Sequence, residues 1–531
     1  MRVNCESCHG PGRAHVEKAG SLGFGDGNLR INTLANLDKD ASLDVCFRCH
    51  ALKDVVREGY LPGDTLADYY ALKFPVLGDQ PYFADGRVRT FAYQANHLAS
   101  ACYLEGPMDC VSCHEPHGQG YWDTNRRPLA SPFDNGQCTS CHPSKAVDVR
   151  KHTFHPPDSE GSRCVSCHMP YLQHPELGRE IRFARSDHTI AIPRPAFDAD
   201  LGITDGCAQC HRDRSARTLQ RQAEAWWGAL RPHRPLVQGL VDELRARNVA
   251  EAGALLLRPD QHDPLIQFEA LARLLVGYLD PDAPQLPDTV LVRLERLATG
   301  SPDPEVKALA LASLHWSRGN DPAVRELLVR ALAHDPGGRL RARWGLALGF
   351  LGDLHRDRKD RTAARAAYAK ALELLPDNPK ILHAQGLMYT GQGDYLAAVR
   401  AFRRAIELDP DLPLARVNLG IALAAMGDAG GAIEAYRAAL TRNPHEALAY
   451  FNLGNVYRRA DDLGAAVDEY RKAIVEDPGL GRAYFELARA LILLGRRADA
   501  LAPARRAVEF MPEHVPARQM LADLEKAAKG G

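Results

Sequence analysis

The chain has 531 residues, with 66 basic and 67 acidic side chains and a formal net charge of −1. This length exceeds one ordinary hydrophobic core and predicts two or three domains, while the balanced charge argues against nucleic acid or an anionic membrane surface as a whole-chain partner. The longest apolar runs, such as residues 344–351, fall well short of the roughly 18 residues that a membrane span needs, which favours a soluble globular protein.

The first 211 residues contain six copies of the pattern Cys-x-x-Cys-His. The copies are Cys5-Cys8-His9, Cys46-Cys49-His50, Cys110-Cys113-His114, Cys138-Cys141-His142, Cys164-Cys167-His168 and Cys207-Cys210-His211. Two thiols at this spacing can form thioethers to one porphyrin, and the adjacent histidine can coordinate its iron. We therefore predict six covalent c-type haems, with these six histidines as proximal ligands. Structural zinc is the alternative, although zinc takes four ligands and does not require a histidine after each second cysteine.

Residues 1–213 are predicted to form a multihaem cytochrome c domain with little regular structure. They are rich in Gly, Pro and His, and 211 residues divided among six motifs leave about 35 residues for each. A chain this sparse cannot build a normal side-chain core, so the porphyrins must supply much of it. The haem-bound and haem-free forms should then differ greatly in stability.

Covalent haem also predicts an exported, periplasmic location, because c-type haem is normally attached outside the bacterial cytoplasm. Residues 1–5 lack the basic, apolar and cleavage-site regions of a secretory signal. The first motif begins only four residues into the chain, with no preceding element to enclose its haem. We therefore expect the sequence to be a truncated or mis-started version of a longer exported protein.

The second axial ligand of each iron determines whether a haem carries electrons or binds a substrate. Seven histidines outside the motifs are candidates for this distal position: His15, His97, His117, His152, His155, His174 and His188. His117, His152 and His155 are the strongest candidates, followed by His15. A surface imidazole is an equal alternative for His97, His174 and His188. Met108 and Met169 have little support as ligands, and the remaining cysteine, Cys102, is predicted to be buried and inert rather than reactive.

Residues 214–342 are predicted to form a helical region similar to HEAT repeats. Three segments begin with Asp-Pro, at 263–264, 303–304 and 321–322, where aspartate caps and proline starts a helix. Apolar residues follow at steps of three and four, as at Val324, Leu327, Leu328 and Ala331. Generic amphipathic helices of any all-α domain give much the same pattern.

Residues 343–531 are predicted to form tetratricopeptide repeats: five helix–turn–helix units over 343–512 and a C-terminal capping helix. Prolines recur every 34 residues at Pro376, Pro410, Pro444, Pro478 and Pro512, and this period is typical of such repeats. Two further rows keep the same phase, one of small residues (Gly352, Gly386, Gly420, Gly454, Ala488) and one of aromatic residues (Tyr368, Phe402, Tyr436, Tyr470) that breaks at Ala504. The concave face of such an array usually binds a protein or peptide.

The motifs at 5–12, 110–117 and 164–170, followed by the repeats, resemble bacterial multihaem c-type cytochromes fused to tetratricopeptide repeats. The haem segment is similar to the octahaem group of hydroxylamine oxidoreductase and the nitrite and tetrathionate reductases. This resemblance implies two further motifs upstream of residue 1 and leaves room for one open haem. The Cys-x-x-Cys-Lys motif that some of these enzymes use is absent from residues 1–531.

Three functions follow from these observations. The first is an exported carrier that relays electrons between redox partner proteins through closely packed haems and docks a partner through its repeats; this reading makes the chain an electron carrier rather than an enzyme. The second is an oxidoreductase that acts on a small nitrogen or sulfur oxyanion at one open haem. The third is a recruitment scaffold whose haems serve assembly or sensing.

Overall fold

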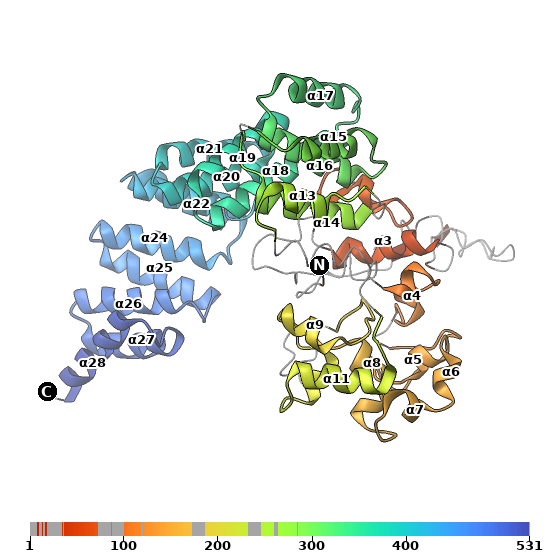
Figure 1. The fold of residues 1–531 in the computed structure, drawn as a ribbon. Coiled ribbons are helices and arrows are strands. Elements are labelled where there is room, and N and C mark those ends of the chain that lie inside the picture. Colours follow the sequence, from red (N-terminus) through yellow and green to blue (C-terminus); the bar gives the residue numbers. More distant parts are fainter. Residues whose placement is uncertain are drawn as a thin grey trace. The chain divides into compact units, whose positions relative to one another are not determined.

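The protein is mainly α-helical and divides into two compact units, Met1–Asp357 and Arg358–Gly531 (Figure 1). The computed structural model describes residues 8–9, 13, 16–17, 34, 37–51, 53–72, 87, 100–117, 120–172, 186–231, 246–259, 264–283 and 285–529. The boundary between the units falls within the first predicted repeat. Helix α18, Arg339–Asp357, belongs to the first unit because it packs against α16, Pro304–Arg318, and buries Trp344 and Leu348.

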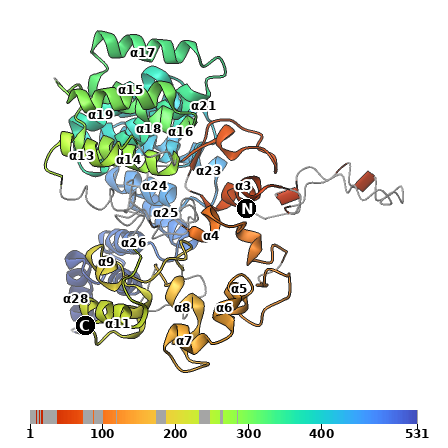
Figure 2. The same ribbon diagram turned by 45° about the vertical axis from the view of Figure 1, so that its right-hand side comes forward.

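The motif-bearing part of the first unit consists mostly of short elements. In chain order they are α3 (Lys39–His50), β1 (Lys53–Val55), η2 (Leu66–Asp68), β2 (Tyr70–Leu72), α4 (Ala101–Leu104), η4 (Cys110–Ser112), α5 (Gly136–Thr139), α6 (Pro143–Ala146), α7 (Val149–Thr153), η5 (Glu160–Ser162), α8 (Cys164–His168), α9 (Pro195–Asp200), α10 (Gly206–Cys210) and α11 (Ala216–Trp227). Strands β1 and β2 pair antiparallel, with Lys53 opposite Leu72. Helices α5 to α8 and α11 gather in one part of this unit in both ribbon views (Figures 1 and 2).

The rest of the first unit is an all-α arrangement of longer helices. Besides α16 and α18 it contains α13 (Val249–Leu256), α14 (Pro264–Tyr278), α15 (Asp288–Gly300) and α17 (Pro322–Ala333). Asp303 caps α16 by accepting hydrogen bonds from the amides of Glu305 and Val306, and Asp321 caps α17 in the same way. Helices α14, α15 and α18 all pack against α16. This explains why α16 is buried along most of its length.

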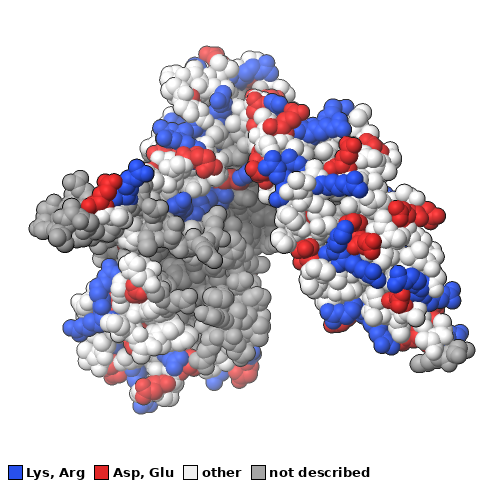
Figure 3. Space-filling view, turned by 180° about the vertical axis from the view of Figure 1, so that it is seen from behind, with Lys and Arg blue, Asp and Glu red and all other residues white. Residues whose placement is uncertain are grey.

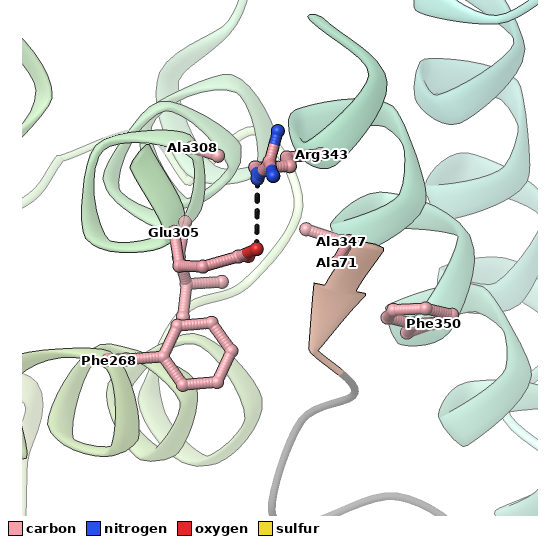
Figure 4. Close-up of a pocket in the computed structure, with 8 residues that line it drawn as sticks. Ala71, Phe268, Glu305, Ala308, Arg343, Ala347 and Phe350 are labelled. Carbon is pink, nitrogen blue, oxygen red and sulfur yellow. Dashed lines mark hydrogen bonds and ion pairs between the residues drawn. The ribbon is translucent and has the colours of Figure 1, made fainter. Parts of the chain in front are cut away.

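A buried ion pair connects the β-hairpin of the first unit to its helices. Arg343 donates from Nε to Glu305 at 2.9 Å and from a terminal nitrogen to the carbonyl of Tyr70 at 3.2 Å. The two charged side chains lie beside a recess of about 10 Å³, enough for roughly one water molecule, with Ala71 and Phe268 in its wall (Figure 4). The arginine thus satisfies a strand carbonyl and a helix carboxylate at once.

The second unit consists of helix pairs that follow one another along the chain. Its helices are α19 (Arg361–Leu374), α20 (Pro379–Gln392), α21 (Tyr395–Leu408), α22 (Ala415–Ala425), α23 (Ala429–Arg442), α24 (Ala447–Arg459), α25 (Leu463–Glu476), α26 (Gly481–Leu493), α27 (Arg497–Phe510) and α28 (Val515–Lys529). Asp360, Asp394, Asp428 and Asp462 cap α19, α21, α23 and α25, so the cap recurs with the period of the repeat. Helix α28 packs on α27 where the predicted capping helix lies.

The small and aromatic rows predicted from the sequence meet within the helix pairs. A methyl group added at Gly386, Gly420 or Gly454 would lie 2.5–2.7 Å from a ring carbon of Phe402, Tyr436 or Tyr470, respectively. Only glycine therefore allows the two helices of each pair to approach this closely. In the last pair both positions are alanine, and Ala488 and Ala504 belong to one buried cluster.

The surface carries mixed charge. Figure 3 shows basic and acidic side chains interspersed over the visible face. In the second unit some ion pairs join a helix to an earlier turn: Arg404 of α21 pairs with Asp377 and Arg442 of α23 with Asp411, each at 2.6 Å. In the described part of the chain, no helix is both long enough and apolar enough to span a bilayer.

Candidate haem-binding sites

The third to sixth Cys-x-x-Cys-His motifs lie on short helical turns, whereas the second ends the 12-residue helix α3. The histidine amide donates to the carbonyl of the first cysteine in at least three of them: His114 to Cys110 at 3.0 Å, His142 to Cys138 at 2.9 Å and His211 to Cys207 at 2.8 Å. This bond closes one turn, on which residues three and four apart are neighbours. Both sulfurs and the imidazole of a motif therefore belong to the same turn.

Consecutive motifs lie side by side. The thiol groups of Cys46 and Cys110 lie close enough together that the pKa of Cys46 is lowered and that of Cys110 raised, and Cys164 and Cys138 are related in the same way. Helix α10 approaches α8 so closely that a methyl group at Gly206 would lie 2.6 Å from the carbonyl oxygen of Ser166. Three interfaces thus bring the second motif to the third, the fourth to the fifth and the fifth to the sixth.

Four motif histidines each face a histidine from outside the motifs. The pairs are His9 with His117 at 5.8 Å, His114 with His188 at 6.3 Å, His168 with His152 at 6.3 Å and His211 with His155 at 6.0 Å between ring centroids. The ring planes are within 12° of parallel in the first three pairs and 34° apart in the fourth. An imidazole nitrogen binds a metal ion at about 2 Å, so two imidazoles on opposite sides of one iron have centroids roughly 6 Å apart.

The identity of the paired histidines is stronger evidence for haem ligation than the distance between their rings. Aromatic rings in direct contact also lie about 4.5–7 Å apart. Each pair, however, joins one proximal candidate to one distal candidate, and all four described distal candidates, His117, His152, His155 and His188, take part. The side chains present therefore fit a haem iron with two axial histidines.

Backbone carbonyls orient three of the paired rings. The Nδ1 atoms of His168, His188 and His155 lie 2.9, 3.0 and 2.5 Å from the carbonyl oxygens of Ala191, Ser186 and Thr153, respectively. A carbonyl can only accept, so Nδ1 carries the proton in each ring and Nε2 retains its lone pair. Histidines that bind metals are held in the same way.

The electrostatics also favour the neutral, ligating form of His114, His152 and His168. His114 keeps an exposed face, but desolvation by the atoms packed around it, with smaller contributions from His188 and His50, lowers its pKa to about 4. Burial likewise lowers the pKa values of His168 and His152. These imidazoles are therefore neutral near pH 7, the state in which histidine binds a metal.

The other candidates vary in position. His50 and His142 are exposed at the ends of their motif turns. Met108 packs against the cluster around Phe47, Met169 directly follows α8, and Cys102 is half-buried in α4. Cys5, His15, His97 and His174 lie outside the described residues. No group of three or more metal-binding side chains lies together in the described ranges.

Several residues at these sites were not singled out by the sequence analysis. Trp226 and Trp227 end α11, and a methyl group at Gly161 would lie only 2.3 Å from the ring of His155. The sequence could have indicated the two adjacent tryptophans as residues of a site, because the chain has only five tryptophans. Gly161 gave no signal, because its role depends on a ring that approaches it through the fold.

Family profiles match parts of the C-terminal region. Two described as tetratricopeptide repeat match residues 347–378 and 417–480, and one described as TPR repeat matches residues 386–427. The prediction of tetratricopeptide repeats in this region is therefore confirmed. A search of curated proteins gave no match to the chain.

Part of the chain is also similar to solved structures. The MamA protein is 29% identical, with 32% of this chain and 92% of MamA covered and a TM-score of 0.29. YrrB, titled a TPR protein with an unusual peptide-binding site, is 22% identical. The similarity covers 32% of this chain and 88% of YrrB, with a TM-score of 0.28. The first TPR of Spaghetti, solved with an HSP90 peptide, is 22% identical. The similarity covers 22% of this chain and 93% of the Spaghetti structure, with a TM-score of 0.22.

Proposed function

We propose that the protein is an exported multihaem c-type cytochrome that relays electrons between redox partners, with its tetratricopeptide repeats docking a protein or peptide. The observation that carries this proposal is the pairing of four motif histidines with four histidines from outside the motifs. A haem held by two histidines exchanges electrons without offering an open position to substrate.

The chain's own residues would perform three tasks in such a carrier. The cysteines of each motif would attach the porphyrin, and the paired histidines would hold its iron from both sides. Contacts such as Cys46 with Cys110 and Cys138 with Cys164 would keep consecutive haems close together. The backbone carbonyls that accept from Nδ1 would fix the ring orientations.

The repeats favour a second candidate function, a recruitment scaffold. Tetratricopeptide repeats bind proteins or peptides, and the family matches support this part of the chain. In this alternative, partner binding is the main activity and the haems serve assembly or sensing. A variant lacking residues 358–531, which keeps α18 in the first unit, would distinguish the two. A scaffold then loses its main activity, partner binding, whereas a carrier still relays electrons from an added reductant to an added oxidant.

Haem content and spin state test the main proposal. We would express the full chain behind an export signal in a host that matures c-type cytochromes, measure the intact mass, and record electron paramagnetic resonance spectra. An electron carrier should contain six covalent haems with low-spin ferric signals. Colourless protein, or a mass without six added cofactors, would reject the proposal.

The same spectra address the oxidoreductase alternative. A high-spin ferric signal that shifts when nitrite or hydroxylamine is added would indicate an open haem that binds a small nitrogen compound. The variant His117→Ala is a positive control for the spectra. It removes one ligand of the His9 pair and should convert one low-spin haem to high spin.

A further inference from the structure

We propose that residues 152–155 supply ligands to two haems at once, and that Trp226, Trp227 and Gly161 are the residues that position this segment. The inference rests on the proposed function, because it assigns ligands to haem iron. His152 faces His168 of the fifth motif, whereas His155 faces His211 of the sixth. One short segment thus reaches two consecutive motifs.

A break in the helix allows the two imidazoles to diverge. Helix α7 ends at Thr153, and Phe154 adopts a left-handed conformation with φ of 55°. Residues three apart on a continuous helix would lie on the same face, so His152 and His155 would then point to one site. A left-handed residue other than glycine is uncommon and needs support from its surroundings.

The two tryptophans of α11 provide that support. The ring of Phe154 stacks on Trp226, with centroids 5.0 Å apart and planes within 3° of parallel. The indole Nε1 of Trp227 donates to the carbonyl oxygen of His152 at 2.8 Å. The ring of Trp226 also meets His155 edge to face at 5.8 Å. The backbone before the break and the ring at the break are therefore both held by one helix.

Helix α11 is itself fixed to the sixth motif. Ser215 caps it by accepting from the amide of Thr218, and Leu219 and Ala223 are buried on one face. The helix packs against α9 and against α10, which contains Cys207 and Cys210. Movement of α11 would therefore change the distal ligands of both haems together.

Gly161 acts on one of the two ligands only. A methyl group at this position would lie 2.3 Å from Cδ2 and 2.8 Å from Nε2 of His155. No side chain can occupy that space while the ring stays in place. The glycine therefore sets how far the His155 ring can approach His211.

This selectivity allows a test in the six-haem protein. His152→Ala and His155→Ala would first identify the paramagnetic resonance signal of each haem, since each removes one sixth of the low-spin intensity. Gly161→Ala should then shift or abolish only the His155 signal, and create one additional carbon monoxide site in the reduced protein. Trp226→Leu should shift both signals, and Trp227→Phe, which removes the indole donor but keeps an aromatic ring, should shift the His152 signal more than the other.

Matched controls separate positioning from general damage. Gly120→Ala adds a methyl group that meets Glu115 at an ordinary 3.7 Å and should leave all signals unchanged. Trp226→Phe keeps an aromatic ring against Phe154 and should restore most of the change seen with Trp226→Leu. Six haems with unchanged signals in Gly161→Ala and Trp227→Phe would overturn the positioning role alone. A haem-free wild type would overturn the proposed function and, with it, the ligand assignment.

Discussion

The motif segment of the first unit and the repeats of the second unit are packed in different ways. Along residues 100–211 most helices have four to six residues, and half-buried histidines such as His152 and His168 form pairs. In the second unit, helices of 11 to 15 residues pack glycine against aromatic rings. In the proposed function, haem lies between the facing histidines of the first arrangement, whereas the second consists of protein atoms alone.

Withholding haem should produce the largest difference between the two regions. In full-length protein made without cytochrome maturation, we expect limited proteolysis to cleave within residues 1–213 while residues 358–531 resist. The physical reason is that bound cofactor stabilises only the folded state of the segment that holds it. Equal resistance of the motif segment with and without haem would contradict the comparison.

Breaking the buried ion pair should weaken only the first unit. Arg343→Met removes the guanidinium that neutralises the largely buried carboxylate of Glu305, and we expect it to lower the free energy of unfolding by about 3 kcal/mol. All five tryptophans lie before residue 358, so their fluorescence during urea unfolding reports this unit. Adding Glu305→Gln should recover part of the loss, because it removes the negative charge that Arg343 neutralised.

Overpacking one repeat should weaken only the second unit. Gly454→Ala forces a methyl group to within 2.7 Å of Cε1 of Tyr470, and we expect it to lower the free energy of unfolding by about 1–3 kcal/mol. Far-ultraviolet circular dichroism during urea unfolding would measure the change. Gly391→Ala is the matched control: this helical glycine has open space around it, so alanine should be neutral or stabilise by up to about 1 kcal/mol.

A buried carboxyl group should give the first unit a smaller pH dependence. Burial, opposed by a hydrogen bond from the amide of Leu66, raises the pKa of Asp44 to about 6. Because the folded pKa lies above the unfolded value of 3.8, its contribution to stability is present below pH 4 and is lost as pH rises through 6. Asp44→Asn should stabilise the unit at pH 7.5 by about 1 kcal/mol and have little effect at pH 4. An equal effect at both values would contradict this assignment.

The repeats could be predicted from the sequence in detail because their determinants are local and periodic. Pro410 and Pro444 mark turns after α21 and α23, and the step of 34 residues appears directly in the sequence. The same rows gave the contact partners, since Gly420 and Tyr436 recur in phase with Gly454 and Tyr470. The sequence did not predict that α18 belongs to the first unit, because this depends on packing against α16.

The motif segment could be predicted only in part. Each Cys-x-x-Cys-His pattern is local, so its proximal histidine is visible in the sequence. A distal histidine is brought to its partner by the fold: His188 and His114 are 74 positions apart (188 − 114) and still face each other. Sequence reasoning ranked His188 among the weaker candidates, because nothing near it in the chain indicates the approach to His114.

The alanine pair at 488 and 504 has a consequence for how the second unit can be rearranged. The inner pairs combine a glycine with a ring, and the last combines two methyl groups. Exchanging the leading helix of the last pair with that of an inner pair would crowd one junction and leave a void in the other. These modules have similar backbones, but they cannot be exchanged for one another. Each helix fits only the partner whose side chain matches its own at this contact.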